Sequence, residues 1–220
     1  MMRHPRVWMG LLLWLAFGSA QAEWAVNMLP GATEVSRSVF DLHMIIFWIC
    51  VVIGVLVFGA MFWSMIIHRR STGQQPAHFH ESTTVEILWT VVPFVILVVM
   101  AVPATKTLIE IYDTSESELD IQITGYQWKW HYKYLGQDVE FFSNLATPAD
   151  QIHNKEAKGE HYLLEVDKPL VLPIGAKVRF LVTSADVIHS WWVPAFAVKR
   201  DAIPGFVNEA WTRIDKPGLY

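Results

Sequence analysis

Cysteine is almost absent from this sequence: Cys50 is the single one among 220 residues, so the chain cannot form a disulfide within itself. Charged residues are scarce as well, at 17%, and the net charge of −4 leaves none of the basic excess that nucleic-acid-binding proteins carry. Hydrophobic residues instead make up 53% of the chain, which is too apolar for an ordinary soluble domain. These proportions indicate a membrane protein and no nucleic-acid partner.

The N-terminus has the pattern of an export signal. Two arginines are followed by an apolar run at 7–17, which is too short to span a bilayer, and then by the small residues Ala20 and Ala22. This order predicts a signal peptide at residues 1–22, cleaved after Ala22, with an uncleaved anchor as the alternative. The segment 23–43 would then lie outside the cytoplasm.

Two long uncharged runs follow, and each is long enough to cross roughly 30 Å of hydrocarbon. They predict transmembrane helices at 44–67 and 85–105, joined by a polar loop at 68–84. The loop carries Arg69 and Arg70, so the positive-inside rule places it in the cytoplasm. Cys50 falls in the first span, where a small buried hydrophobe is the simplest interpretation.

The remainder of the chain, residues 106–220, changes to short alternating runs separated by Pro, Gly, Asn and Asp. A period of two predicts strands, and several short strands favour a β-sandwich or barrel. The predicted strands are "LDIQITGYQWKWHYKYL", "HYLLEV", "PLVLP", "KVRFLVTS", "VIHSWWVP" and "EAWTRI". The predicted fold is therefore a two-helix transmembrane hairpin followed by an all-β domain.

Alternating aromatic residues mark the first predicted strand, and all should share one face. They are Tyr126, Trp128, Trp130, Tyr132 and Tyr134. Such a face usually packs in a core, although an exposed tryptophan among them could serve as a contact or an electron-transfer element.

Glu86 lies at the start of the second span and has two interpretations. Thr83-x-x-Glu86 matches a capping box, which would give the carboxylate a structural role. An ionisable group at the membrane edge of a helix bundle can equally mark a proton pathway.

His189 is the candidate metal ligand. A single histidine near the end of a strand is more often a hydrogen-bonded structural residue than a ligand. Copper and zinc sites gather thiolates, imidazoles or thioethers, and the chain after Ile188 has no cysteine, no methionine and no second histidine. The residues alone leave both roles open.

Several words in the sequence, in this order, resemble subunit II of cytochrome c oxidase, a haem–copper terminal oxidase. They are "TVEILWTVVPFVIL", "GYQWKWHYKY", "LLEVDKPLVLP", "SADVIHSWWVPAFAVKRDAIPG" and "KPGLY", and they extend over nearly the whole chain. The resemblance implies a cupredoxin-like periplasmic domain with a binuclear copper centre, which accepts electrons from cytochrome c and passes them to haem in subunit I for reduction of O2 to water. It also implies a proton-pumping complex in the bacterial inner membrane.

The resemblance assigns roles by position. Trp128 matches the surface tryptophan at which the electron enters, Glu86 matches a glutamate at the mouth of a proton pathway, and His189 matches the first copper ligand. Three acidic residues would form the docking surface for cytochrome c: Asp138, Asp186 and, more weakly matched, Glu140.

The chain departs from the family pattern after Tyr220, where the family continues into a Cys-x-Glu-x-Cys run and then a His and a Met. We therefore expect a C-terminally truncated chain, an incomplete β-domain with an unpaired edge strand, no copper bound by this chain, and no activity of the chain alone. The alternatives are a copper-free subunit II of the quinol-oxidase type and a non-catalytic anchored β-domain.

Overall fold

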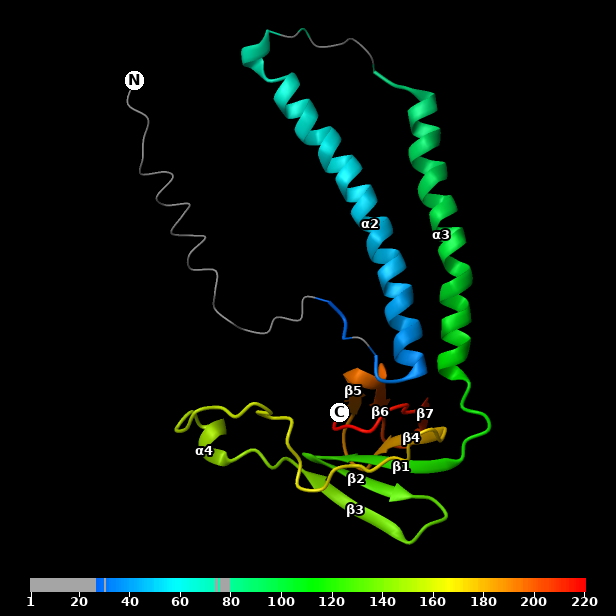
Figure 1. Cartoon of the computed structure of the whole chain (residues 1–220), viewed down its shortest axis with the longest axis vertical. Coiled ribbons are helices and arrows are strands. Elements are labelled where there is room, and N and C mark those ends of the chain that lie inside the picture. The colour runs from blue at the N-terminus through cyan, green and yellow to red at the C-terminus, as the bar shows by residue number, and fades with distance from the viewer. Residues whose placement is uncertain (1–26, 30, 74, 76–79) are drawn as a thin grey trace.

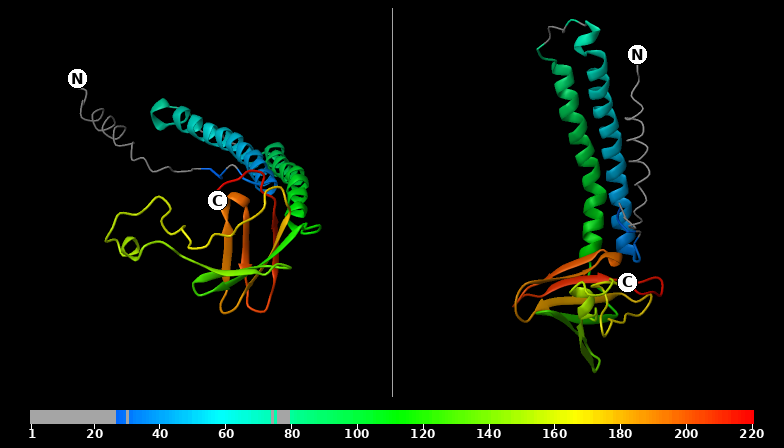
Figure 2. Two further views of the ribbon diagram at one scale, coloured as in Figure 1. Left: turned by 60° about the horizontal axis from the view of Figure 1, so that its bottom comes forward. Right: turned by 90° about the vertical axis from the view of Figure 1, so that its left-hand side faces the viewer.

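The computed structural model describes residues 27–220 apart from residues 30, 74 and 76–79. The signal peptide predicted at 1–22 lies outside the described residues. Within them, two long helices stand on a β-domain (Figure 1). The second view in Figure 2 shows the two helices side by side along their length.

Helix α2 covers Glu34–Ile67 and helix α3 covers Thr83–Tyr112. Both are long and apolar enough to cross a membrane, and their most apolar stretches are not buried by the rest of the chain. The predicted spans 44–67 and 85–105 lie inside these helices. At 1.5 Å per residue, the 34 residues of α2 extend over about 51 Å, so the helix continues well past the hydrocarbon layer toward the β-domain.

The extra turns of α2 have a local cause. Thr33 is the N-cap and is fully buried, and its hydroxyl accepts a hydrogen bond from the Ser36 amide at 3.1 Å while the Ser36 hydroxyl accepts one from the Thr33 amide at 2.9 Å. Directly before the cap, the Ala32 amide donates to the Ala195 carbonyl oxygen at 2.9 Å. The helix therefore begins on the surface of the β-domain and not at the membrane.

The end of α3 is held against the same domain. The Trp211 indole Nε1 donates to the Glu110 carbonyl oxygen at 2.9 Å, and the Thr114 hydroxyl donates to the Glu209 carboxylate at 2.7 Å. A tryptophan, with its apolar ring and one polar nitrogen, suits a junction of this kind. Both helices are thus attached to the β-domain by named hydrogen bonds.

The β-domain contains two sheets. A five-stranded sheet has the order β3-β2-β1-β4-β7, in which β1 and β4 are parallel and the other neighbours antiparallel, and a two-stranded sheet pairs β5 with β6. The strands are β1 Leu119–Tyr126, β2 Lys129–Tyr134, β3 Val139–Asn144, β4 Val178–Ser184, β5 His189–Val193, β6 Val198–Ala202 and β7 Asn208–Thr212, with a short helix α4 at Ala149–Ile152 and a 3-10 turn at Pro194–Phe196.

The core lies between the two sheets. Ile121, Ile123 and Phe180 are fully buried on the inner face of the large sheet, and Trp191 and Phe196 cover them from the other side. Every second residue of β4 is buried, as expected for a strand with one face on the core. The two-helix hairpin followed by an all-β domain is therefore confirmed.

The first predicted strand was wrong in its extent. Residues 119–134 form two antiparallel strands, because the chain reverses at Gln127 and Trp128, with Tyr126 paired to Lys129. The reversal places Tyr126 on the face opposite Tyr132 and Tyr134, which are buried in the core. A tight two-residue turn does not disturb the alternation of residue types, so the period-two pattern could not reveal it.

Two further predictions about strands were wrong. The segments "HYLLEV" and "PLVLP" form no regular strand: the first makes an isolated bridge at Val166, and the second is followed by one at Ile174. Strands β3 and β6 were not predicted. The apolar residues of these segments pack on the core as loops, as Leu170 and Leu172 do. Among the described strands, β7 pairs on one side only, with β4, and is an edge of the large sheet.

Candidate functional site

Trp128 is the most exposed tryptophan side chain described, with 85% of its surface accessible. It occupies the second position of the two-residue turn between β1 and β2, so neither sheet face can cover it. A large apolar ring held in water by a tight turn has no role in the core. Of the two roles left open by the sequence, the structure excludes core packing for Trp128.

Asp186 ties this turn to His189. One carboxylate oxygen accepts the Gln127 amide at 2.7 Å, and the other accepts a hydrogen bond from His189 Nε2 at 2.7 Å and the Val187 amide at 2.6 Å. The bond from His189 is the main reason why the pKa of the Asp186 carboxyl falls from 3.8 to about 2. The backbone amide of Gln127, just before Trp128, and the imidazole of His189 therefore both donate to the same carboxylate, that of Asp186.

The ring of His189 is enclosed from three directions. Its side chain is only 14% exposed, its ring centroid lies 5.9 Å from that of Trp130 in an edge-to-face arrangement, and its third neighbour is the backbone of Gly125. A Cβ atom added at Gly125 would lie 2.7 Å from His189 Cδ2, so glycine is needed for this close approach.

The described residues do not complete a binuclear copper site. Among them, no group of three or more His, Cys, Asp or Glu side chains is close enough to hold a metal ion. The single cysteine of the chain, Cys50, lies on α2, and the Nε2 atom of His189 is already bonded to Asp186. A thiolate-bridged copper pair needs more soft donors than these side chains provide.

An exposed apolar surface adjoins the turn. Val187 and Ile188 follow Asp186 directly in the chain and are both exposed, Ile188 at 68%. Since the Asp186 carboxylate accepts the Gln127 amide, the loop that carries Val187 and Ile188 lies beside the turn that carries Trp128. We call Trp128, Val187 and Ile188 the Trp128 patch.

The three predicted docking acids are not gathered around this patch. Asp138 is exposed in the turn between β2 and β3, and Glu140 pairs with Lys133 at 3.3 Å near the start of β3. Trp128 lies at the other end of the six-residue strand β2, which at about 3.3 Å per residue is a separation of roughly 20 Å. Only Asp186 is near the turn, and its oxygens are occupied by internal hydrogen bonds.

Glu86 is far from these groups, in the first turn of α3. The helix starts at Thr83 with Ser82 as N-cap, and no side chain caps it, so the predicted capping box is wrong. The part of the chain that the structure describes records no hydrogen bond or ion pair for the Glu86 carboxylate. Glu86 still lies in the first turn of α3, where the helix dipole favours a carboxylate, so both interpretations of this residue stay open.

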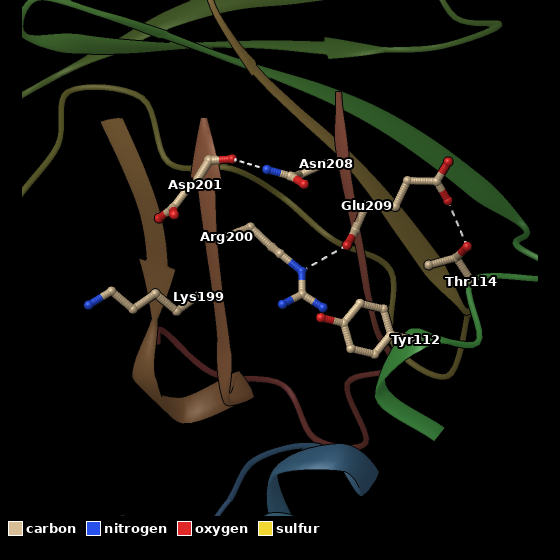
Figure 3. A pocket seen from close by; sticks show the side chains of 7 residues that line it. All are labelled: Tyr112, Thr114, Lys199, Arg200, Asp201, Asn208 and Glu209. Carbon is tan, nitrogen blue, oxygen red and sulfur yellow. Dashed lines mark hydrogen bonds between the residues drawn. The ribbon is translucent and has the colours of Figure 1, made fainter. Parts of the chain in front are cut away.

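A depression of about 500 Å3 lies where α3 meets β6 and β7 (Figure 3). Arg200 crosses it, with its guanidinium 4.9 Å from the Tyr112 ring and its Nε donating to the Glu209 carbonyl oxygen at 2.8 Å. Figure 3 shows Lys199 and Asp201 on the opposite side of β6, as alternation along a strand requires. These charges do not converge, so the depression is a helix–sheet junction and not a ligand site.

Comparison with known proteins decides the family. The family described as cytochrome C oxidase subunit II, transmembrane domain, matches residues 21–107, and the one described as cytochrome C oxidase subunit II, periplasmic domain, matches residues 119–220. The chain belongs to the cytochrome c oxidase subunit II family. Members of this family are subunits of an oxidoreductase complex, so partner subunits are implied, and the two apolar helices make the chain a membrane-anchored protein.

Relatives from the family differ in how much of their length the chain spans. A "Probable cytochrome c oxidase subunit 2" of Rickettsia conorii is 38% identical over 205 residues, which is 93% of this chain and 64% of that protein. The corresponding protein of Rickettsia bellii is 36% identical over 100% of this chain and 81% of that protein. The chain thus spans slightly less than two thirds of the length of several curated relatives.

A solved structure is also similar: the periplasmic domain of subunit II of cytochrome oxidase from Bradyrhizobium japonicum. The sequence identity is 40%, the TM-score is 0.41, and the match covers 48% of this chain and 70% of that one.

Sequence reasoning missed Gly125 and Gln127, which hold His189 and the turn in place. One signal was present: Asp186 and His189 are three residues apart at the start of a strand, a spacing that allows a carboxylate to bond the imidazole. Nothing in the linear sequence indicated that the turn containing Gln127 and Trp128 would donate a second hydrogen bond to Asp186.

Proposed function

We propose that this chain is the subunit at which electrons enter a cytochrome c oxidase. In this role it accepts electrons from cytochrome c at the Trp128 patch and passes them toward haem in subunit I, where O2 is reduced to water. The observation that carries the proposal is the exposure of Trp128 at a turn whose backbone is bonded through Asp186 to His189.

The Trp128 patch has the chemistry of a transient docking site. Its centre is apolar and aromatic, and aromatic side chains are the usual anchors of protein interfaces. Strands β1, β2 and β3 lie at the end of the β-domain farthest from the two helices (Figure 1), where a water-soluble donor can reach them. With the loop at 68–84 in the cytoplasm, this end lies in the periplasm of a bacterium, and the helices cross the inner membrane.

His189 supports the proposal because it is hydrogen-bonded to Asp186, which also accepts the Gln127 amide of the turn. The resemblance makes it one copper ligand, but the other described residues do not complete a binuclear site, so we attribute no step of the electron path to copper. What these residues do is hold the His189 ring at a fixed place, 2.7 Å from Asp186 and against Gly125.

The membrane helices fit the same role. Their exposed apolar surfaces suit contact with other membrane helices, which in this proposal belong to subunit I. Glu86, with its carboxylate at the predicted cytoplasmic end of α3, is proposed to lie at the mouth of a proton pathway shared with that subunit.

The test is the rate at which the complete oxidase complex oxidises reduced cytochrome c, measured by stopped flow. Trp128→Ala should lower the second-order rate constant at least tenfold. Trp192→Ala is the matched control, because Trp192 is an exposed tryptophan on β5 and should change the rate less than twofold. An unchanged rate in Trp128→Ala would support a non-catalytic anchored domain instead.

A separate test addresses Glu86. Glu86→Ala should slow steady-state turnover while leaving the first electron transfer from cytochrome c unaffected. Glu86 belongs to the first turn of α3, and Figure 1 shows that the start of α3 is at the opposite end from strands β1 and β2. Glu81→Ala, which removes an exposed acid just before the helix, is the control. Normal turnover in Glu86→Ala would contradict the proton role.

A further inference from the structure

We infer that Arg213 binds the phosphate group of an anionic phospholipid where the β-domain meets the membrane. The binding site is separate from the Trp128 patch, because it lies where strand β7 meets the end of helix α3. It requires the two membrane helices and does not depend on electron entry at Trp128.

Arg213 lies on the face of the β7 segment that turns away from the core. Ala210, Thr212 and Ile214 are all buried, and Ala210 and Ile214 belong to the core cluster. Side chains alternate between the two faces of an extended chain, so Trp211 and Arg213 share the opposite face.

This face lies between the two helices where they reach the β-domain. Trp211 Nε1 donates to the carbonyl oxygen of Glu110 near the end of α3, and Ile214 pairs with Thr33, the N-cap of α2. The second view of Figure 2 shows the C-terminal part of the chain, in red, on the helix side of the β-domain. Arg213 therefore points from the β-domain into the space beside the end of α3.

The guanidinium group of Arg213 has no partner among the described residues. Its Nε atom is buried and makes no hydrogen bond, whereas its two terminal Nη atoms also lack a partner but are not buried. A buried donor without a partner is costly and calls for an explanation. The exposed Nη pair is the part of an arginine that binds phosphate through two parallel hydrogen bonds.

A second cation lies on the same face. Lys177 Nζ lies 4.6 Å above the Trp211 ring. Val178 pairs with Thr212, so Lys177 and Arg213, each one position further along its strand, are neighbours at the end of the β4–β7 ladder. Like charges at neighbouring cross-strand positions destabilise a sheet, and an anion bound beside them removes this repulsion.

The acids nearest to these two cations have other partners. Asp215, two residues after Arg213, pairs with Arg37, and Glu118 Oε1 accepts the Lys177 amide at 3.0 Å. These carboxylates contribute negative charge to the surroundings, but no described acid is within ion-pairing distance of the Arg213 guanidinium. The chain therefore leaves the Nη pair free for an external anion.

The depth of the site in the membrane selects the ligand. The apolar run 85–105 ends five positions before Glu110, which is about 7.5 Å at 1.5 Å per residue. Each headgroup layer of a bilayer is about 5–7 Å thick, so Trp211 and Arg213 lie at its outer boundary. Tryptophan is enriched at this level, and arginine reaches along it to phosphates. The ligand is the phosphodiester of an anionic phospholipid, because zwitterionic headgroups carry an ammonium group that opposes binding.

The experiment measures hydrogen exchange by mass spectrometry in the complete oxidase complex. The complex is placed in nanodiscs of phosphatidylcholine alone and in nanodiscs of equal parts phosphatidylcholine and phosphatidylglycerol. In the wild type, phosphatidylglycerol should slow exchange about fivefold in the peptide that contains Trp211 and Arg213. Arg213→Gln should abolish this difference, and Arg213→Lys should keep part of it, because lysine binds phosphate as a point charge.

Lys106→Gln is the matched control. Lys106 is an exposed cation directly after the apolar run, so its loss removes one positive charge at the same membrane surface. This variant should keep the full lipid difference. The peptide that contains the core residue Phe180 reports on folding and should be unchanged in every variant. If Arg213→Gln disturbs that peptide as well, Arg213→Lys decides, because it must retain part of the lipid effect.

Four results would overturn the assignment. Wild-type exchange that is equal in the two lipids would show that no anionic lipid binds, and equal effects of Arg213→Gln and Lys106→Gln would show general surface attraction only. Free phosphate that protects the peptide equally in phosphatidylcholine nanodiscs would indicate an anion site without lipid. Faster exchange of Arg213→Gln by the same factor in both lipids would assign the arginine to a carboxylate of a partner subunit.

Discussion

The Asp186 carboxylate accepts a hydrogen bond from His189 at 2.7 Å and, through its other oxygen, one from the Gln127 amide at the same distance. A residue that matched a docking acid in the family is thus an internal connector between the exposed turn and the enclosed imidazole. These bonds lower the pKa of the Asp186 carboxyl to about 2, so the group stays ionised and keeps a negative charge beside the turn.

Replacing Asp186 with Ala should loosen the turn before Trp128. The loss of a charge-assisted bond to the Gln127 amide should raise hydrogen exchange in the peptide containing Gln127 by roughly tenfold, measured by mass spectrometry on the intact complex. Asp138→Ala removes an exposed acid from the next turn and serves as the control. Equal exchange in both variants would show that Asp186 does not hold the turn.

Gly125→Ala should be poorly tolerated. The added methyl group would lie 2.7 Å from His189 Cδ2 and 2.9 Å from His189 Cγ, so the strand or the ring must move. Overpacking of this kind costs about 1–3 kcal/mol in the free energy of unfolding. Gly159→Ala is the matched change, because its nearest atom, Gln151 Oε1, is at an ordinary 3.6 Å. The apparent unfolding temperature in detergent should drop for Gly125→Ala and hold for Gly159→Ala.

The ion pair between Arg179 and Asp120 predicts a dependence of stability on pH. The hydrogen bond from Arg179 lowers the pKa of the Asp120 carboxyl below 3.8, so the folded protein binds its proton less readily than the unfolded chain. The stabilisation is present above pH 3.8 and is lost as the pH falls through the lower folded value. Asp120→Asn should remove about 1 kcal/mol at pH 7 and flatten this acid limb, as followed by unfolding at several pH values.

The buried cap of α2 should be sensitive to loss of one hydroxyl. Thr33→Ala removes the acceptor of the Ser36 amide at a fully buried site, which should cost about 1–2 kcal/mol. Thr33→Ser keeps the oxygen and should cost much less. Both would be compared by thermal unfolding, and equal losses would mean that the methyl group, and not the cap, is what matters.

Local patterns were enough to predict most of the fold. Long uncharged runs predicted both helices, and alternation predicted β4, β5 and β7, because each of these features depends on neighbours in the sequence. The turn at Trp128 was missed, since a two-residue reversal preserves alternation. The loops at 161–173 were taken for strands because apolar residues pack on a core in irregular segments as well.

The candidate site likewise combines residues that the sequence identified with a spatial arrangement that it did not. Trp128, Glu86, Asp138, Glu140 and His189 were all found in the sequence, but their grouping was not. Asp138 is separated from Trp128 by the length of β2 and Glu140 by most of it, whereas Asp186 is brought to Gln127, beside Trp128, across 59 positions of the chain. Which acids lie beside the tryptophan depends on strand pairing, and pairing is a long-range property.

The sequence by itself determined that this chain has two apolar helices and a β-domain of the subunit II family, because hydrophobicity and motif order are local. Only the tertiary structure decided that Trp128 is exposed at a turn and that the Asp186 carboxylate bonds both the Gln127 amide of that turn and the His189 ring. Those outcomes depend on which strands meet in the sheet, and contacts between distant segments are what folding adds to the order of residues.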